Sequence, residues 1–321
     1  MRKACLDQVY QLAKADKRVV FIGSDLGVGT LDQFKLEMPE RFFIEGVSEA
    51  NIIGMAAGLA LEGHVVYVNT IATFITRRCF EQVVLDLCLH NANVRLIGNG
   101  GGLVYAPLGP THEAIEDLAI LRAIPGMTII APADAEEMRR AMRLTVDYSG
   151  PIYIRVAKGG DPIVSNGDAP FAIGKAIPMR QGADAVIVTT GITLKIGLDA
   201  AAALESEGLA VGVVHVPTVK PLDVAAILAA ASGARAVVAV EEHSVIGGLG
   251  SAVAEVLAEA DFHLAKRFKR IGIPDVFPDE YGSQESLLAR FHITASDVAA
   301  AVRDLCGAVI PGSKAYSQGA Y

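Results

Sequence analysis

Short apolar runs rich in β-branched residues recur along the first half of the chain, and stretches with helical periodicity separate them. Such runs are typical of buried strands, and they predict strands at 19–22, 65–68, 94–97, 128–130 and 152–154. Between them the pattern predicts helices at 50–61, 76–89 and 135–146, the last with Asp134 as its N-cap. Alternating strands and helices indicate parallel sheets covered by helices.

The same alternation returns after a segment of different composition. Residues 158–170 are dense in Gly, Pro, Asp and Asn, which is typical of an exposed connection between domains. Beyond it, apolar runs predict strands at 185–190, 211–216, 236–241 and 270–273. We therefore expect an α/β fold with two doubly wound, mainly parallel-sheet domains at 1–165 and 183–311, a linker at 166–182 and a tail at 312–321.

Length, hydropathy and charge limit the kinds of partner. The 321 residues, 52% of them hydrophobic, suffice for two separate cores. The chain carries 36 acidic and 28 basic residues, a net charge of −8, and no basic run longer than Arg77-Arg78, which argues against nucleic acid as a partner. Its apolar runs end well before the roughly 18 residues that a membrane span requires. We expect no membrane contact, and apolar surface buried in cores and subunit interfaces.

The cysteines bear on metal binding and on location. Cys5, Cys79, Cys88 and Cys306 lie far apart without a Cys-x-x-Cys pair, so neither a zinc site nor an iron–sulfur cluster is predicted. The N-terminus lacks the continuous apolar stretch of a signal peptide. These features predict a cytoplasmic protein with reduced thiols and with no metal ligands of its own.

The most informative acidic residue is Glu49, in the sequence Glu-Gly-Val-Ser-Glu-Ala-Asn-Ile-Ile-Gly-Met-Ala-Ala-Gly. It stands where an apolar segment turns into a helix of small residues, which allow another backbone or a flat ligand to approach closely. Val47, Ile52 and Ile53 predict an apolar setting for it. Two interpretations remain open: a charge favoured at a helix start, or a carboxyl group kept buried for a function.

Five further stretches stand in a fixed order after this segment, at 72–80, 109–127, 131–134, 219–223 and 241–250. The clearest begins Gly-Pro-Thr-His-Glu-Ala-Ile-Glu-Asp-Leu. The ordered set resembles the transketolase family over nearly the whole chain, and it is highly specific although no single motif is decisive. The resemblance implies a pyrimidine-binding domain followed by a C-terminal domain, with thiamine diphosphate as the cofactor.

The resemblance assigns several residues to the cofactor. Glu49 matches the glutamate that hydrogen-bonds the pyrimidine ring nitrogen and thereby activates thiamine. Phe74 and Phe80 match the aromatic wall beside the pyrimidine, although two aromatics on one helix face are also typical of a core. Asp25 matches an aspartate near the thiazolium and is equally a turn former. Arg77 follows Phe74 by three residues, as an arginine does in 1-deoxyxylulose-5-phosphate synthases.

Other matches concern the substrate. His112 corresponds to the histidine that faces the reacting carbon and assists proton transfer. Lys158 and Arg155 fall where the family holds a substrate phosphate with arginine, and Lys158 is the closer match. Leu108 replaces an aspartate that reads a substrate hydroxyl, and Gly100 replaces a histidine that helps hold the acceptor phosphate. A buried leucine cannot bond a hydroxyl, so we expect an altered sugar preference.

One expected motif is absent. The family holds the diphosphate through a metal ion bound by Gly-Asp-Gly and a later asparagine, whereas both Gly-Asp pairs here, at 160–161 and 167–168, lack the second glycine. The resemblance therefore implies a separate partner, the N-terminal half of a split transketolase, which carries Gly-Asp-Gly and binds Mg²⁺ or another divalent ion. A heterotetramer of two plus two subunits is the expected assembly.

These matches predict a transferase active only with its partner, which moves a two-carbon ketol unit from a ketose, expected to be phosphorylated, to an aldehyde. Three alternatives remain. The β subunit of a 2-oxo acid dehydrogenase has a similar length but lacks the Pro-Thr-His-Glu run. A 1-deoxyxylulose-5-phosphate synthase is normally one long chain. A non-catalytic regulatory subunit is disfavoured because Glu49, Phe74 and His112 are all retained.

Overall fold

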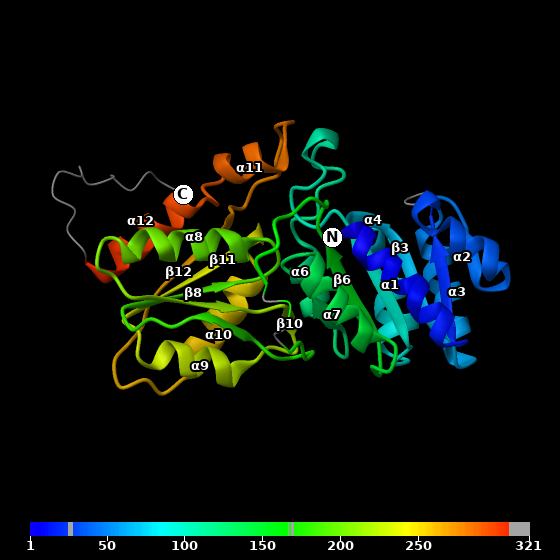
Figure 1. The fold of residues 1–321 in the computed structure, drawn as a ribbon, viewed down its shortest axis with the longest axis horizontal. Coiled ribbons are helices and arrows are strands. Elements are labelled where there is room, and N and C mark those ends of the chain that lie inside the picture. The colour runs from blue at the N-terminus through cyan, green and yellow to red at the C-terminus, as the bar shows by residue number, and fades with distance from the viewer. Residues whose placement is uncertain (25–27, 166, 168–169, 308–321) are drawn as a thin grey trace.

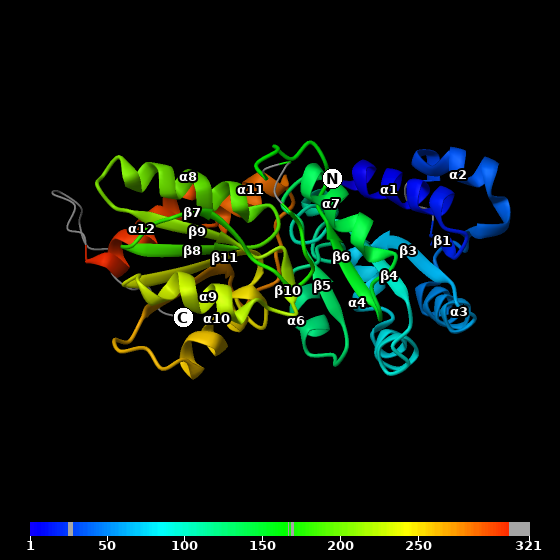
Figure 2. The same cartoon turned by 60° about the horizontal axis from the view of Figure 1, so that its bottom comes forward.

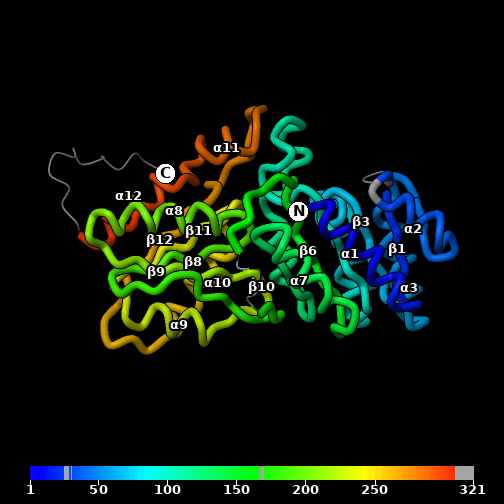
Figure 3. The backbone as a smooth tube through the Cα atoms, in the orientation of Figure 1, coloured from blue at the N-terminus to red at the C-terminus, as the bar shows by residue number. Residues whose placement is uncertain are grey.

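The structure is a computed structural model that describes residues 1–24, 28–165, 167 and 170–307. Asp25 and the tail expected at 312–321 lie outside these residues. Two α/β units lie side by side along the long axis, as the ribbon and the tube both show (Figures 1 and 3). The predicted fold class is therefore confirmed.

A seven-stranded sheet forms the first unit, in the order β10-β5-β6-β4-β3-β1-β2. All neighbouring strands are parallel except β10, which is antiparallel to β5. In chain order the strands are β1 (Val19–Gly23), β2 (Phe42–Ile44), β3 (Val65–Ile71), β4 (Val94–Asn99), β5 (Thr128–Ile130), β6 (Ile152–Val156) and β10 (Thr218–Lys220).

Helices cover both faces of this sheet (Figure 2). One face packs against α3 (Glu49–Leu61), α4 (Ala72–Thr76), a π-helical turn at Val83–Cys88 and α6 (Asp117–Arg122). The other packs against α1 (Arg2–Ala15), α2 (Asp32–Glu37) and α7 (Ala135–Thr145). Alternate residues of a strand point to opposite faces, so Val20 and Ile22 enter one core while Val19 and Phe21 enter the other.

The second unit is a five-stranded sheet in the order β12-β11-β8-β9-β7, parallel except for β7. Its helices also lie on both faces: α8, α11 and α12 on one, α9 and α10 on the other. The elements are β7 (Ile177–Arg180), β8 (Ala185–Thr189), α8 (Thr193–Glu205), β9 (Val211–His215), α9 (Val224–Ser232), β11 (Ala236–Ser244), α10 (Leu249–Glu259), β12 (Arg267–Ile273), α11 (Gln284–Arg290) and α12 (Ala295–Cys306).

The helix predictions are partly wrong. Asp134 is the N-cap of α7 as predicted, because its side chain accepts bonds from the backbone N–H groups of Glu136 and Glu137. The single helix predicted at 76–89 is instead divided into α4, α5 (Phe80–Gln82) and the π-helical turn, with a turn at 77–79. Cys79 has a non-helical backbone, and its thiol donates to the Ile75 carbonyl 3.2 Å away. This turn positions two arginines at the site described next.

Candidate active site

Several of the predicted site residues lie at the carboxyl edge of the first sheet, where ligands of α/β proteins bind. Phe74 follows β3 in α4, Gly100 follows β4, and Lys158 follows β6. Glu49 begins α3, which comes after β2. Parallel strands end at the same edge, so the topology brings together residues that are distant in sequence.

Glu49 is buried, with 2% of its surface exposed. Its Oε2 accepts a bond from Arg78 Nη1 at 2.8 Å, whereas its Oε1 is buried and has no hydrogen-bond partner among the described residues. Ile52 and Ile53 are buried as predicted, but Val47 is 69% exposed. A buried acceptor atom without a partner is costly, and such atoms in native proteins are often completed by a ligand.

Phe74 is connected to this carboxyl group through Arg78, and His112 is connected to it through Phe74. The two rings meet edge to face, with their centroids 5.3 Å apart. The Arg78 guanidinium lies over the Phe74 ring, 4.0 Å from its centroid. His112 Nδ1 is 2.9 Å from the Thr111 hydroxyl. The structure therefore links a buried carboxylate, a cation, an aromatic ring and an imidazole in one continuous series of contacts.

Arg77 and Phe80 make no hydrogen bond or ion pair with Glu49 among the described residues, and their predicted roles beside the cofactor stay predictions. Arg77 Nε is 2.6 Å from Glu116 Oε1, and its Nη2 donates to the Glu113 carbonyl at 3.0 Å. Arg77 thus ties the turn at 77–79 to the segment that carries His112. Phe80 is 37% exposed, and among the described residues its ring makes no contact with that of Phe74.

Three predicted substrate residues line one pocket of about 220 Å³: Gly100, Leu108 and Lys158. Arg2 and Tyr105 line it too. Arg2 was missed from the sequence, since nothing in the pattern connects the second residue with residue 158. Two cations in one small pocket favour an anionic group of a ligand.

Gly100 and Leu108 are the two residues of this pocket that replace a histidine and an aspartate of the resembled family. Gly100 has a φ of +76°, and a Cβ there would lie 2.1 Å from the Tyr105 ring, so a histidine at 100 would require both to move. Leu108 is 48% exposed, on a 3₁₀ turn at Ala106–Leu108. The expectation of a buried leucine was therefore wrong, because this turn lies at the rim of the pocket.

Arg155 lies in the interior, 7% exposed. Its Nε and Nη2 donate to the two oxygens of Asp117, at 2.9 and 3.0 Å, and Nη2 also donates to the Glu242 carbonyl of β11 at 3.0 Å. Tyr153 donates its hydroxyl to the same carboxylate at 2.7 Å. This buried network joins the two units and occupies the Arg155 guanidinium, whereas Lys158 lines the pocket of Gly100 and Leu108.

Two glutamates near His112 are buried: Glu113, which follows it in the sequence, and Glu242 of β11. Glu113 is 1% exposed, and neither of its carboxylate oxygens has a hydrogen-bond partner among the described residues. Burial raises the pKa of Glu113 to about 7, and the Glu242 carboxylate adds to this effect. Burial also raises the pKa of Glu242 to about 7. Glu242 Oε1 accepts bonds from Leu103 N at 2.9 Å and from Gln284 Nε2 at 2.7 Å.

We predict that Glu113→Gln makes the chain more stable at pH 8. A folded-state pKa of about 7, against the ordinary 4.5, means that the folded chain binds this proton more tightly than the unfolded chain. The free energy of unfolding therefore falls as pH rises from 4.5 to 7, because the unfolded chain releases this proton before the folded chain does. Denaturation at pH 5 and pH 8 should show about 1 to 3 kcal/mol gained at pH 8 only.

The exposed Glu81→Gln is the matched control for this experiment and should leave both values unchanged. A lower free energy of unfolding at pH 8 in Glu113→Gln would mean that the ionised Glu113 carboxylate has hydrogen-bond partners in the folded chain.

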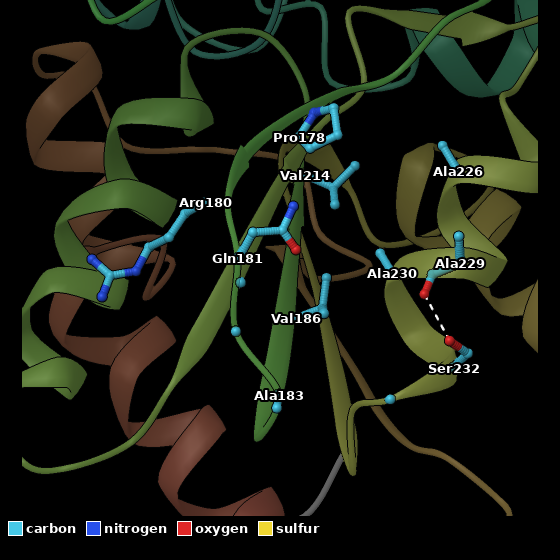
Figure 4. A pocket seen from close by; sticks show the side chains of 13 residues that line it. Pro178, Arg180, Gln181, Ala183, Val186, Val214, Ala226, Ala229, Ala230 and Ser232 are labelled. Carbon is cyan, nitrogen blue, oxygen red and sulfur yellow. Dashed lines mark hydrogen bonds between the residues drawn. The ribbon is translucent and has the colours of Figure 1, made fainter.

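A second pocket, of about 380 Å³, lies between the sheet of the second unit and α9 (Figure 4). Val186, Val214, Ala226 and Ala230 are among its lining residues, and no predicted site residue is. Arg180, Gln181 and Ser232 line this pocket as well, and Arg180 is paired with Glu205 at 2.7 Å. The predicted site residues therefore leave the edge of the first sheet as the candidate site.

No group of three or more His, Cys, Asp or Glu side chains within the described ranges could hold a metal ion. In the same part of the chain, no helix has the length and apolar character needed to cross a membrane.

Two mainly parallel sheets covered by helices define a two-domain α/β protein, and a carboxylate, an aromatic ring and an imidazole at the edge of the first sheet form its candidate ligand site. Residues 1–160 match the family "Transketolase, pyrimidine binding domain" and residues 174–298 match "Transketolase, C-terminal domain". The chain belongs to the transketolase family.

Three known proteins show which part of this family it represents. An apulose-4-phosphate transketolase subunit of Phocaeicola vulgatus is 38% identical over 85% of this chain and 87% of its own. A solved structure titled "Split gene transketolase, inactive beta4 tetramer" is 37% identical, with a TM-score of 0.86, and covers 95% of this chain and 98% of that one. A Synechococcus 1-deoxy-D-xylulose-5-phosphate synthase is 37% identical over 91% of this chain but 45% of its own. The chain thus corresponds to the second subunit of a split enzyme of the transketolase type.

Proposed function

We propose that this chain is the subunit of a two-component transketolase that supplies the glutamate acting on the aminopyrimidine of thiamine diphosphate. The observation that carries the proposal is Glu49, a buried carboxyl group whose Oε1 has no partner among the described residues and whose Oε2 is bonded by Arg78, which also lies over the Phe74 ring. The transferred group would be a two-carbon ketol unit, moved from a ketose to an aldehyde.

The residues present fit a thiamine cofactor. When bound, it supplies the carbanion stabilisation needed to cleave a bond beside a carbonyl group. Glu49 would donate a hydrogen bond from its protonated carboxyl to the ring nitrogen, and Phe74 would pack against the ring face. His112 is in edge-to-face contact with the Phe74 ring, which supports a position next to this site, where the imidazole would move a proton to or from a substrate oxygen.

A partner subunit would complete the site. The sequence lacks Gly-Asp-Gly, and no metal-ligand cluster occurs in the described residues, so Mg²⁺ or another divalent ion is assigned to the partner. Gly54 and Gly58 lie on the exposed face of α3, and nothing lies within 4 Å of a Cβ at Gly58. Such a smooth helix face allows close approach of another chain. We propose an assembly of two plus two subunits in a reducing cytoplasm, where the four thiols stay free.

We predict that the isolated chain binds thiamine diphosphate weakly, with a dissociation constant above about 100 µM even with Mg²⁺, because the diphosphate ligands are missing. With a partner of the Gly-Asp-Gly type, affinity and turnover should both appear. Calorimetry on each subunit and on the mixture is the measurement. Micromolar or tighter Mg²⁺-dependent binding by the isolated chain would rule out the divided site.

The substrate proposal rests on the pocket of Arg2, Gly100, Leu108 and Lys158. The two cations would attract an anionic end of the ketose, while Leu108 offers no bond to a hydroxyl in its middle. The names of the Phocaeicola and Synechococcus relatives specify phosphate esters, which supports an anionic substrate. The second candidate function is synthesis of 1-deoxyxylulose 5-phosphate, and formation of that product by the reconstituted pair would favour it.

We predict weak discrimination among ketose phosphates by the unmodified pair, within about 10-fold in kcat/KM. Leu108→Asp should improve kcat/KM for xylulose 5-phosphate by about 10-fold, since it restores an acceptor for a substrate hydroxyl. Leu36→Asp, an exposed leucine on α2, is the matched control. A strong preference of the unmodified pair for xylulose 5-phosphate, with no gain from Leu108→Asp, would contradict this role of Leu108.

A further inference from the structure

Arg78 occupies both groups on which the proposed cofactor site depends. Its Nη1 is 2.8 Å from Glu49 Oε2, and its guanidinium carbon is 4.0 Å from the centroid of the Phe74 ring. Arg78 lies in the turn at 77–79, and its side chain is 43% exposed while that of Glu49 is 2% exposed. The cation thus reaches from the solvent side onto a buried carboxylate and an aromatic face.

This arrangement cannot persist in the active site proposed above. Glu49 accepts a charge-assisted bond from Arg78 as an ionised carboxylate, whereas its role toward the ring nitrogen requires it to donate a bond. The ring face of Phe74 is also covered. A guanidinium is planar and presents an N–C–N edge to a carboxylate, and so does an aminopyrimidine. Arg78 therefore resembles the missing ring in shape and in hydrogen-bonding edge.

We propose that Arg78 is an internal ligand, which fills the place of the aminopyrimidine in the cofactor-free chain and leaves when the cofactor binds. This inference rests on the proposed function. Before assembly the contact keeps Glu49 from being buried without a partner, which is costly for a charged group. A side chain that is nearly half exposed can return to water by rotating away from the turn. The apparent dissociation constant of the cofactor is then the intrinsic one divided by the fraction of chains from which Arg78 has left.

The first test measures the dissociation constant of thiamine diphosphate for the reconstituted pair with saturating Mg²⁺. Arg78→Ala should tighten binding by about 5- to 30-fold, which corresponds to the loss of a partly exposed ion pair and a cation–π contact. Turnover at saturating cofactor should change less than about 3-fold, since chemistry begins only after Arg78 has left. Arg290→Gln, which removes a surface ion pair of the same 2.8 Å length with Glu280, should leave affinity unchanged.

A second test needs neither turnover nor cofactor affinity. A double-mutant cycle between Arg78→Ala and Glu49→Gln, followed by denaturation, should show coupling in the cofactor-free chain and none in the cofactor-loaded pair. Failure of the unmodified pair to bind the cofactor would overturn the proposed function, and this inference with it. Cofactor binding that is unchanged or weakened by Arg78→Ala, or equal coupling in both states, would overturn the role of Arg78 alone.

Discussion

Glu49→Gln is expected to lower turnover of the reconstituted pair by about 100- to 10,000-fold and to leave folding and assembly intact. The substitution keeps the size of the side chain and its place at the start of α3. It removes the carboxyl proton that would be donated to the pyrimidine ring nitrogen. The Glu49 side chain is 2% exposed and its Oε1 has no partner in the described chain, so this contact would depend on the Glu49 carboxyl group itself.

Glu62→Gln is the matched control, since Glu62 is an exposed glutamate at the opposite end of the same helix. Size-exclusion chromatography of the pair and circular dichroism measure assembly and folding, and a coupled assay measures turnover. Near-normal turnover in Glu49→Gln would remove this residue from the mechanism. Loss of assembly in Glu49→Gln but not in Glu62→Gln would make Glu49 a structural residue.

The strands of both sheets could be predicted because most of them are apolar runs buried on both faces. All nine predicted strands occur in the structure. The three strands that were not predicted, β2, β7 and β10, have three or four residues each and lie at sheet edges, where the apolar signal is short. β10 also pairs with β5 across a separation of some 90 residues, which no local pattern indicates.

Some residues of the candidate site could be predicted from sequence motifs, whereas others could not. Glu49, Phe74 and His112 could be assigned from ordered motifs, and the structure connects them through Arg78, although their roles stay predictions. In the sequence, nothing distinguishes the two arginines of the doublet Arg77-Arg78. Only the turn between α4 and α5 separates them, directing one to the His112 segment and the other to Glu49.

Arg155 shows what a strand pattern cannot reveal. It was expected at a substrate phosphate, yet it is the fourth of the five residues of β6 and faces the interior. Its counter-ion, Asp117, begins α6 and lies 38 residues earlier in the sequence. A buried arginine on a strand requires such a partner, but the sequence does not say which carboxylate provides it.

The second large effect is expected for Asp117→Ala, which should lower the free energy of unfolding of the isolated chain by about 3 to 5 kcal/mol. The substitution leaves the buried Arg155 guanidinium without a counter-ion and removes the acceptor of the Tyr153 hydroxyl. Since Arg155 also donates to the Glu242 carbonyl of the second unit, the contact between the two units should weaken. Urea denaturation, followed separately by probes placed in each unit, measures both effects.

Asp147→Ala provides the comparison for this experiment, because the Asp147 carboxylate pairs with Arg18 at 2.8 Å while remaining 80% exposed. A surface ion pair contributes about 0 to 1 kcal/mol, so this variant should be nearly as stable as the unmodified chain. Each variant removes a carboxylate from an arginine at a similar distance, but the Asp117 contact is buried and bidentate, whereas Arg18 is half exposed and keeps Asp16 as a second partner at 2.6 Å. Equal losses in both would show that the Asp117 network does not hold the His112 segment against the second unit. A loss confined to Asp117→Ala, with separation of the two units at a lower urea concentration, would identify this buried pair as a link between the two units.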